Sequence, residues 1–159
     1  MQLKRGCSGV WIAAAAAVLD RITKSASLGI ENGGIVPLIP GLINIRPVVN
    51  TGMAFSMFSG RTAFLTAVTI LMVAGLAAWL IVRPDSQTKL MRTGLWMVAG
   101  GGLGNVYDRL LYGHVIDFIE LDFVRFAIFN VADIFICVGV GLTALGMILD
   151  EMKKEHPHE

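Results

Sequence analysis

The chain has 159 residues, of which 55% are hydrophobic and 16% are charged, and its formal net charge is +1. This hydrophobic share lies well above the usual one, and with a mean hydropathy of +0.68 it predicts a membrane protein. The basic residues are scattered along the chain, so nothing in the charge pattern points to nucleic-acid binding.

The first apolar segment is rich in alanine and follows Lys4 and Arg5. A basic start before an apolar run is also typical of a cleavable signal peptide. The run nevertheless continues into a polar phrase in which Asp20 and Lys24, at positions i and i+4, share one helical face. We therefore expect a retained helix over about residues 8–25, with polar groups at its outer end.

Three further apolar segments follow, over about residues 62–82, 93–111 and 130–149. The first of these is uncharged and has the roughly 20 residues that a membrane-spanning helix needs. The second is rich in glycine, which permits close helix packing. Together the four segments predict an α-helical membrane protein with four transmembrane helices in a single domain over residues 1–159.

Two connecting segments differ from the spans. Between the first two, prolines and Gly41 break helices, and Ile43 to Arg46 alternates apolar and polar residues as a strand would. We expect a small extracytoplasmic β-sheet there. Phe118 to Phe129, between the last two spans, is amphipathic and apolar enough to lie on the membrane.

The loop from Arg83 to Arg92 is short and carries three cations and one anion. The positive-inside rule places such a loop in the cytoplasm. Both termini then lie in the cytoplasm as well, and the polar helix ends face outward.

The unusual polar residues converge at this outer level. Asp20 and Lys24 close the first span, and Asn50 can reach the same level from the outer loop; the remaining members are Asn105, Asp108, Arg109, Asp117, Asn130 and Asp133. Simpler interpretations remain open for some of them. Asp108 and Arg109 could form a local ion pair at a helix end, Asn130 could cap the last helix, and Asp20 with Lys24 could be a structural pair.

Asp117 and Asp133 are the strongest catalytic candidates. An ionised aspartate within a membrane costs about 2.5–3.5 kcal/mol on insertion scales, and such acids usually serve a function. Two carboxylates a few ångströms apart share one proton, so one can activate a water while the other donates to a carbonyl. No serine-hydrolase or zinc-protease phrase is present, and Cys7 and Cys137 suggest neither a disulfide nor a metal site.

Two other functions are compatible with paired acids. A proton- or cation-coupled carrier would place acids at helix ends, although four short spans without a repeat suit it poorly. A metal-dependent enzyme acting on lipid head groups could use Asp108, Asp117 and Asp122 as ligands.

Five phrases resemble, in order, those of the lipoprotein signal peptidases (signal peptidase II): residues 20–24, 50–56, 100–109, 113–118 and 129–133. The resemblance implies an aspartic endopeptidase of the bacterial inner membrane, with its active site at the outer leaflet. It also implies that Asp117 and Asp133 are the catalytic dyad. The residues that would shape and polarise the pocket are Asp20, Lys24, Asn50, Gly52, Asn105, Arg109 and Asn130.

The same resemblance implies the partners. The substrates would be prolipoproteins that carry a diacylglyceryl cysteine, cut just before that cysteine, and the enzyme would contact membrane lipid but no nucleic acid. We expect a monomer without cofactor or metal. Met53 departs from the family pattern, which usually has a small residue there, and could narrow the pocket.

Overall fold

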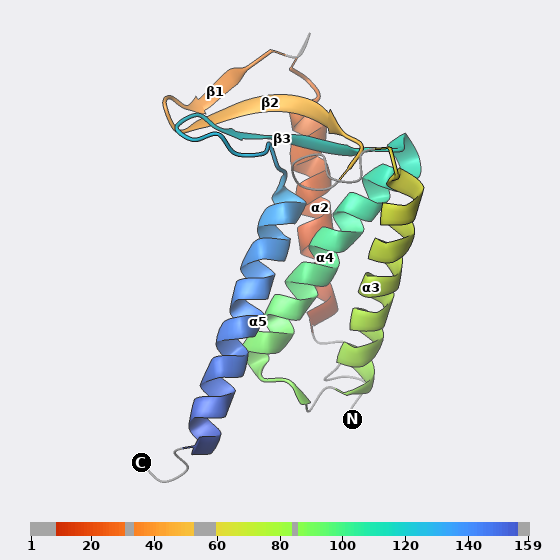
Figure 1. Ribbon diagram of the computed structural model, residues 1–159, viewed down its shortest axis with the longest axis vertical. Helices are drawn as coiled ribbons and strands as arrows, with labels where there is room; N and C mark the ends of the chain where they lie inside the picture. Colours follow the sequence, from red (N-terminus) through yellow and green to blue (C-terminus); the bar gives the residue numbers. More distant parts are fainter. Residues whose placement is uncertain (1–8, 31–33, 53–59, 84–85, 156–159) are drawn as a thin grey trace.

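The computed structural model describes residues 9–30, 34–52, 60–83 and 86–155. Within these ranges, a bundle of helices carries a small β-sheet at one end (Figure 1). In chain order the elements are α2 (Val10–Ser27), β1 (Val36–Ile39), β2 (Ile43–Asn50), α3 (Thr62–Val82), α4 (Lys89–Tyr112), β3 (Val115–Leu121) and α5 (Val131–Glu155).

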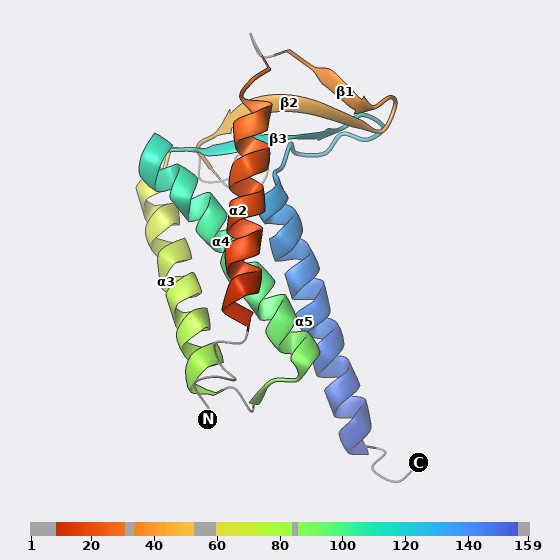
Figure 2. The same ribbon diagram turned by 180° about the vertical axis from the view of Figure 1, so that it is seen from behind.

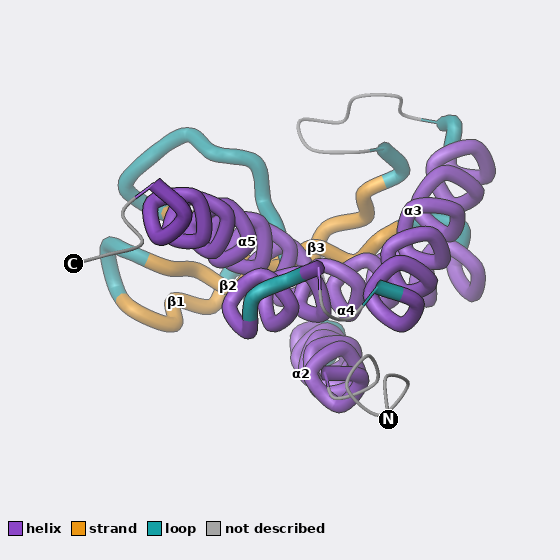
Figure 3. Tube along the Cα trace, turned by 90° about the horizontal axis from the view of Figure 1, so that it is seen from below, coloured by secondary structure: helices purple, strands orange, loops and turns teal. Residues whose placement is uncertain are grey.

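Helix α4 is the central element of the bundle and contacts α2, α3 and α5. Seen along the bundle, α2 lies on one side of α4, while α3 and α5 flank it (Figure 3). Helix α2 begins, and α5 ends, at the end of the bundle away from the sheet (Figure 2). The other ends of both helices therefore meet the sheet.

Glycines allow α4 to approach its neighbours closely. Gly94 of α4 and Gly139 of α5 face each other, and a Cβ atom on either would collide with the backbone oxygen of the other. On the α2 side, a Cβ atom on Gly100 would lie 2.6 Å from the backbone oxygen of Ala13. The glycine-rich sequence of α4 thus produces the close helix packing that it predicted.

Two of the helices, α3 and α5, are long and apolar enough to cross a membrane by length and composition. The bounds predicted for α3 agree with those observed, whereas α4 and α5 extend beyond their predicted ranges. Helices α2 and α4 carry more charge, including Asp20, Lys24, Asp108 and Arg109. Those charges explain why neither reaches the same hydropathy as α3 and α5.

The sheet is antiparallel in the order β1-β2-β3. The predicted strand around Ile43 is confirmed as part of β2, but the sheet does not come only from the segment between the first two helices. Its third strand, β3, follows α4 and includes the first residues of the segment from Phe118 to Phe129, which the sequence predicts to lie on the membrane. Gly113, at φ 75°, ends α4 in a left-handed conformation that suits glycine and turns the chain into β3.

The contact between Gly94 and Gly139 generates a stability prediction. We expect Gly139→Ala to destabilise the protein by about 1–3 kcal/mol, because the added methyl group has no space against α4. Gly141→Ala is the matched control on the same helix: its Cβ atom would meet nothing within 4 Å. Thermal unfolding in detergent measures both, and an equal loss in the two variants would contradict the proposed contact.

Candidate active site

The candidate site lies where the helices meet the sheet. Asp117 is the third residue of β3, and Asp133 is in the first turn of α5. Val115 to Phe118 are all buried, so this strand passes through the interior between the sheet and the helix ends. The apolar strand thereby carries one carboxylate into a desolvated position.

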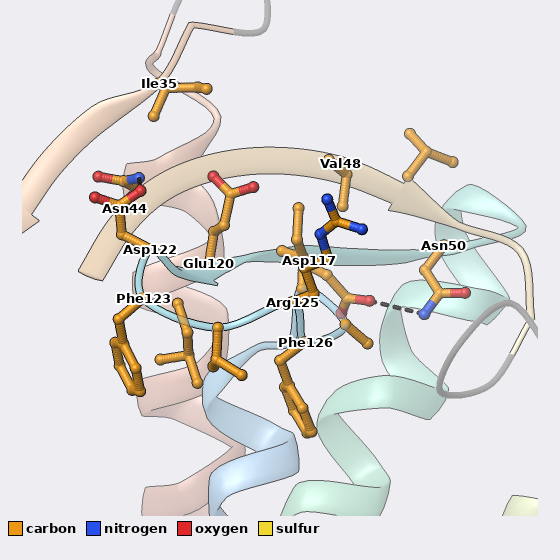
Figure 4. Close-up of a pocket in the computed structure, with 15 residues that line it drawn as sticks. Ile35, Asn44, Val48, Asn50, Asp117, Glu120, Asp122, Phe123, Arg125 and Phe126 are labelled. Carbon is orange, nitrogen blue, oxygen red and sulfur yellow. Dashed lines mark hydrogen bonds between the residues drawn. The ribbon is translucent and has the colours of Figure 1, made fainter. Parts of the chain in front are cut away.

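Asp117 is held by two amide groups. Asn50, at the end of β2, donates from Nδ2 to Asp117 Oδ2 at 2.7 Å, and Asn130 donates from Nδ2 to Oδ1 at 2.6 Å. Figure 4 shows the Asn50 side chain pointing toward the Asp117 carboxylate. Burial raises the pKa of Asp117 to about 6; the charge of Asp133 also raises it, while the two amide bonds and Lys24 act in the opposite direction.

Asp133 takes part in a capping box. The Asn130 side-chain oxygen accepts a hydrogen bond from the backbone N–H of Asp133 at 3.0 Å, and Asp133 Oδ2 accepts one from the N–H of Asn130 at 3.2 Å. The predicted capping role of Asn130 is therefore confirmed. Asn130 is also fully buried and bonds both aspartates, so one residue ties Asp117 to Asp133.

Lys24 fixes the orientation of Asn105. The Lys24 ammonium is fully buried and donates to Asn105 Oδ1 at 3.1 Å. Because an ammonium can only donate, the Asn105 oxygen must face Lys24. The Asn105 amide nitrogen then points to Asp133 Oδ1, to which it donates at 2.9 Å.

The two other acceptors of Lys24 are carboxylates. Its Nζ atom lies 2.8 Å from Asp20 Oδ2 and 2.8 Å from Asp108 Oδ2, so all three ammonium donors have partners. The pair predicted between Asp20 and Lys24 is present. The ion pairs of Asp108 are with Lys24 and, at 3.5 Å, with Arg21; a local pair with its sequence neighbour Arg109 is not the arrangement found.

Arg109 instead reaches the bend just after β2. It donates to the backbone oxygen of Gly52 at 3.0 Å, and its charge interacts with the carboxylates of Asp133 and Asp117. The N–H of Gly52 donates to Asn50 Oδ1 at 2.9 Å, which holds the Asn50 amide toward Asp117. Met53 lies outside the described residues, so the predicted narrowing of the pocket is not tested.

Two cavities meet at Asp117. One, of about 450 Å³, has mostly apolar walls and extends along α5; among its lining residues are Asn105, Arg109, Asp117, Asp133, Ile134 and Val138. The other, of about 900 Å³, lies between the sheet and residues 122–128 and includes Asn44, Glu120, Asp122 and Arg125 (Figure 4). Asn50 and Asp117 line both cavities, so the candidate site joins an apolar space to one of mixed polarity.

The structure brings all nine predicted site residues into one hydrogen-bonded and charged cluster. The sequence does not predict the ion pairs of Asp108 with Lys24 and Arg21. It also gives no sign of the position of Arg21, whose guanidinium lies 5.5 Å and 5.4 Å from the ring centroids of Tyr107 and Tyr112. The alternative metal site is not supported: Asp108 pairs with Lys24, whereas Asp122 accepts from Asn44. No group of three potential ligands occurs among the described residues.

Buried acids and amides gather at one end of an apolar helix bundle, an arrangement typical of a membrane enzyme, and similarity to known proteins specifies the class. The family model for Signal peptidase (SPase) II matches residues 12–149. The chain therefore belongs to the signal peptidase II family, which is a family of proteases.

Relatives from several bacteria agree. A lipoprotein signal peptidase of Clostridium acetobutylicum is 36% identical over 92% of this chain and 97% of its own, and one of Chromobacterium violaceum is 40% identical over 91% of each. A bacterial membrane enzyme solved by the in meso method at 2.3 Å resolution has a TM-score of 0.84 at 30% identity, covering 92% of this chain and 91% of its own. These matches support a membrane location.

The raised pKa of Asp117 predicts a pH dependence of stability. The folded state holds this proton more tightly than the unfolded state, whose carboxyl has its ordinary pKa of 3.8. Stability contributed by Asp117 is therefore greatest at low pH and is lost as the pH rises to about 6, by up to about 1.4 kcal/mol per pH unit.

Asp117→Asn removes this contribution, so the unfolding free energy of the variant changes less steeply than that of the wild type between about pH 4 and 6. Thermal unfolding across this range measures the slopes. Asp122→Asn, at an exposed acid just beyond β3, is the matched control. A wild-type slope in Asp117→Asn would rule out the raised pKa.

Proposed function

We propose that this protein is an aspartic endopeptidase of the bacterial inner membrane that removes the signal peptide from diacylglyceryl-modified prolipoproteins. It cuts just before the lipidated cysteine. Membership of the signal peptidase II family supports the reaction and the substrate class. The lipoprotein signal peptidases that resemble this chain over most of their length support the same assignment.

One observation carries the two-aspartate mechanism. Asn130 bonds Asp117 through its side chain and Asp133 through its backbone, which keeps the two carboxylates beside one buried residue. Both also line the same cavity, and their charges interact. Charge coupling of this kind is how paired acids come to share a proton.

In the proposed mechanism Asp117 holds the shared proton and Asp133 is the ionised base. Burial raises the pKa of Asp117 to about 6, whereas the N-terminus of α5 favours negative charge on Asp133. Asp133 takes a proton from water as the water oxygen bonds to the scissile carbonyl carbon. Asp117 donates its proton to the carbonyl oxygen.

The resulting diol collapses when Asp133 gives its proton to the leaving nitrogen and Asp117 recovers a proton from one hydroxyl group. The C–N bond breaks and both acids return to their starting state, so the step needs no metal. The remaining predicted residues hold this geometry: Asn105 and Asn130 orient the acids, while Asn50 and Arg109 form the wall toward β2.

The two cavities suit the two parts of such a substrate. The apolar cavity along α5 suits the signal peptide and lipid, and the cavity beneath the sheet, which has both polar and apolar walls, suits the residues that follow the cysteine. Since the predicted site residues come into contact within a single copy of the chain, the proposed site is complete in a monomer.

We further propose four membrane spans, with both termini in the cytoplasm and the site at the outer leaflet. Helices α3 and α5 are apolar enough to span. The charges that lower the hydropathy of α2 and α4 are partly internal, because Asp20, Lys24 and Asp108 are at most 1% exposed. Charges that pair inside the protein remain compatible with a spanning helix.

The catalytic roles predict the effect of isosteric substitution. Asp117→Asn and Asp133→Asn each remove one proton-transfer group, so we expect kcat for a lipid-modified prolipoprotein peptide to fall by at least about 100-fold. Gel-based cleavage measures it, with Asp150→Asn as the matched control, because Asp150 pairs with Lys154 near the end of α5 and lines neither cavity. If both variants kept near wild-type rates, the two-aspartate mechanism would be wrong.

The bond from Asn50 predicts a shift in the pH profile. This bond lowers the pKa of Asp117, so Asn50→Ala raises that pKa and moves the alkaline limb of kcat/KM to higher pH. Asn44→Ala is the control for the position of the limb, because the Asn44 side chain, also on β2, donates to Asp122 rather than to Asp117. A limb that stayed in place in Asn50→Ala would contradict the assignment of the proton to Asp117.

A further inference from the structure

The backbone just before each proposed catalytic aspartate is held by another buried carboxylate. Asp20 Oδ1 accepts a hydrogen bond from the N–H of Ala132 at 2.8 Å, and Ala132 directly precedes Asp133. Asp108 Oδ2 accepts one from the N–H of Ile116 at 3.2 Å, and Ile116 directly precedes Asp117. In both segments that carry the dyad, the backbone N–H just before the aspartate therefore donates to a buried carboxylate.

Lys24 forms ion pairs with both of these carboxylates, Asp20 and Asp108. Its Nζ atom lies 2.8 Å from a carboxylate oxygen of Asp20 and 2.8 Å from one of Asp108. All three side chains are at most 1% exposed. An unbroken series of short polar contacts therefore runs from the start of α5, through α2 and α4, to β3.

We propose that these three residues, Asp20, Lys24 and Asp108, form a spacer that sets the separation between Asp117 and Asp133. Asp20 and Asp108 are then positioning residues, which act through the backbone of their neighbours rather than on the substrate. The inference deepens the proposed function and rests on it for its catalytic consequence.

Simple attachment of helices does not explain this arrangement. Buried ion pairs cost desolvation energy, and apolar replacements of similar volume often hold helices together equally well. Helices α2 and α4 already pack closely where Gly100 meets Ala13 and Ala16. What the triad adds is directed bonds to two particular backbone N–H groups.

Gly104 offers a test that removes no charge. A Cβ atom on Gly104 would lie 2.6 Å from Asp20 Oδ2 and 3.2 Å from its Cγ atom, so Gly104→Ala displaces the Asp20 carboxylate. Gly102→Ala is the matched control on the same helix. A Cβ atom there would instead meet the Val73 side chain, on α3, at 2.7 Å.

The experiment uses the full chain in detergent with a lipid-modified prolipoprotein peptide. We expect Gly104→Ala to lower kcat by at least about 10-fold with KM within about two-fold of the wild type, because a displaced spacer misplaces the reacting groups. Gly102→Ala keeps kcat within about two-fold at a comparable change in melting temperature. Equal losses of kcat in both variants, or none in Gly104→Ala, would overturn the proposal.

A second pair of variants keeps the test independent of how Gly104→Ala folds. Asp108→Asn keeps the shape of the side chain but loses the charged contact with Lys24, and we expect the same fall in kcat. Asp150→Asn is its control, since Asp150 forms an exposed i, i+4 pair with Lys154. Because both act on one spacer, the effects of Asp108→Asn and Gly104→Ala are not additive. Full activity of Asp108→Asn, or additive losses, would reject the spacer.

An infrared titration separates this proposal from the proposed function. The Asp117 carboxyl band is identified by its disappearance in Asp117→Asn, and its midpoint depends on the distance to Asp133. We expect the midpoint to shift in Gly104→Ala and Asp108→Asn but not in their controls, whether or not the protein cleaves prolipoproteins. An unchanged midpoint in both variants would contradict the spacer, whereas a failure of wild-type cleavage alone would contradict only the proposed function.

Discussion

A single buried ammonium group organises the polar end of this bundle. Lys24 Nζ has three donors and three acceptors, which come from its own helix and from α4. Neither lipid nor bulk water reaches it, so these acceptors have to be supplied by the protein. The orientation of Asn105, and through it the donor that faces Asp133, follows from this requirement.

The polar cluster depends in turn on the small residues around it. Gly101 and Gly104 lie on α4 beside Ala132, which brings the start of α5 close enough for the Ala132 N–H to reach Asp20. Larger side chains at those positions would separate α4 from α5 and leave that N–H without an acceptor. Packing and hydrogen bonding therefore depend on each other here. The glycines allow α4 and α5 to approach closely, and the Asp20 carboxylate then accepts the hydrogen bond from the Ala132 N–H.

Much of the site could be predicted from local patterns. The i, i+4 spacing of Asp20 and Lys24 specifies a pair on one helix, and Asn130 three residues before Asp133 specifies a cap. The bounds of α3 follow from its uncharged length between Arg61 and Arg83. The two contacts join residues close in sequence and the helix bounds depend on one continuous segment, so local spacing is enough to predict all three.

The parts that could not be predicted depend on contacts between distant residues. Asp108 forms its ion pair with Lys24, in another helix, and not with its sequence neighbour Arg109. No periodicity in the sequence predicts that pairing. Strand β3 is equally hidden, because four consecutive buried residues from Val115 to Phe118 show no alternation. It forms a strand because it pairs with β2. The paired residues nearest in sequence, Asn50 and Val115, are 65 positions apart.

The difference between the two aspartates follows from the elements that carry them. Asp133 lies in the first turn of a helix, where the backbone N–H groups and the helix dipole favour a negative charge. Asp117 lies on a buried strand, which has no comparable dipole, and desolvation there favours the neutral acid. One acid therefore sits at a helix N-terminus and the other on a desolvated strand, and it is this difference in setting on which our proposed assignment of the proton to Asp117 rests.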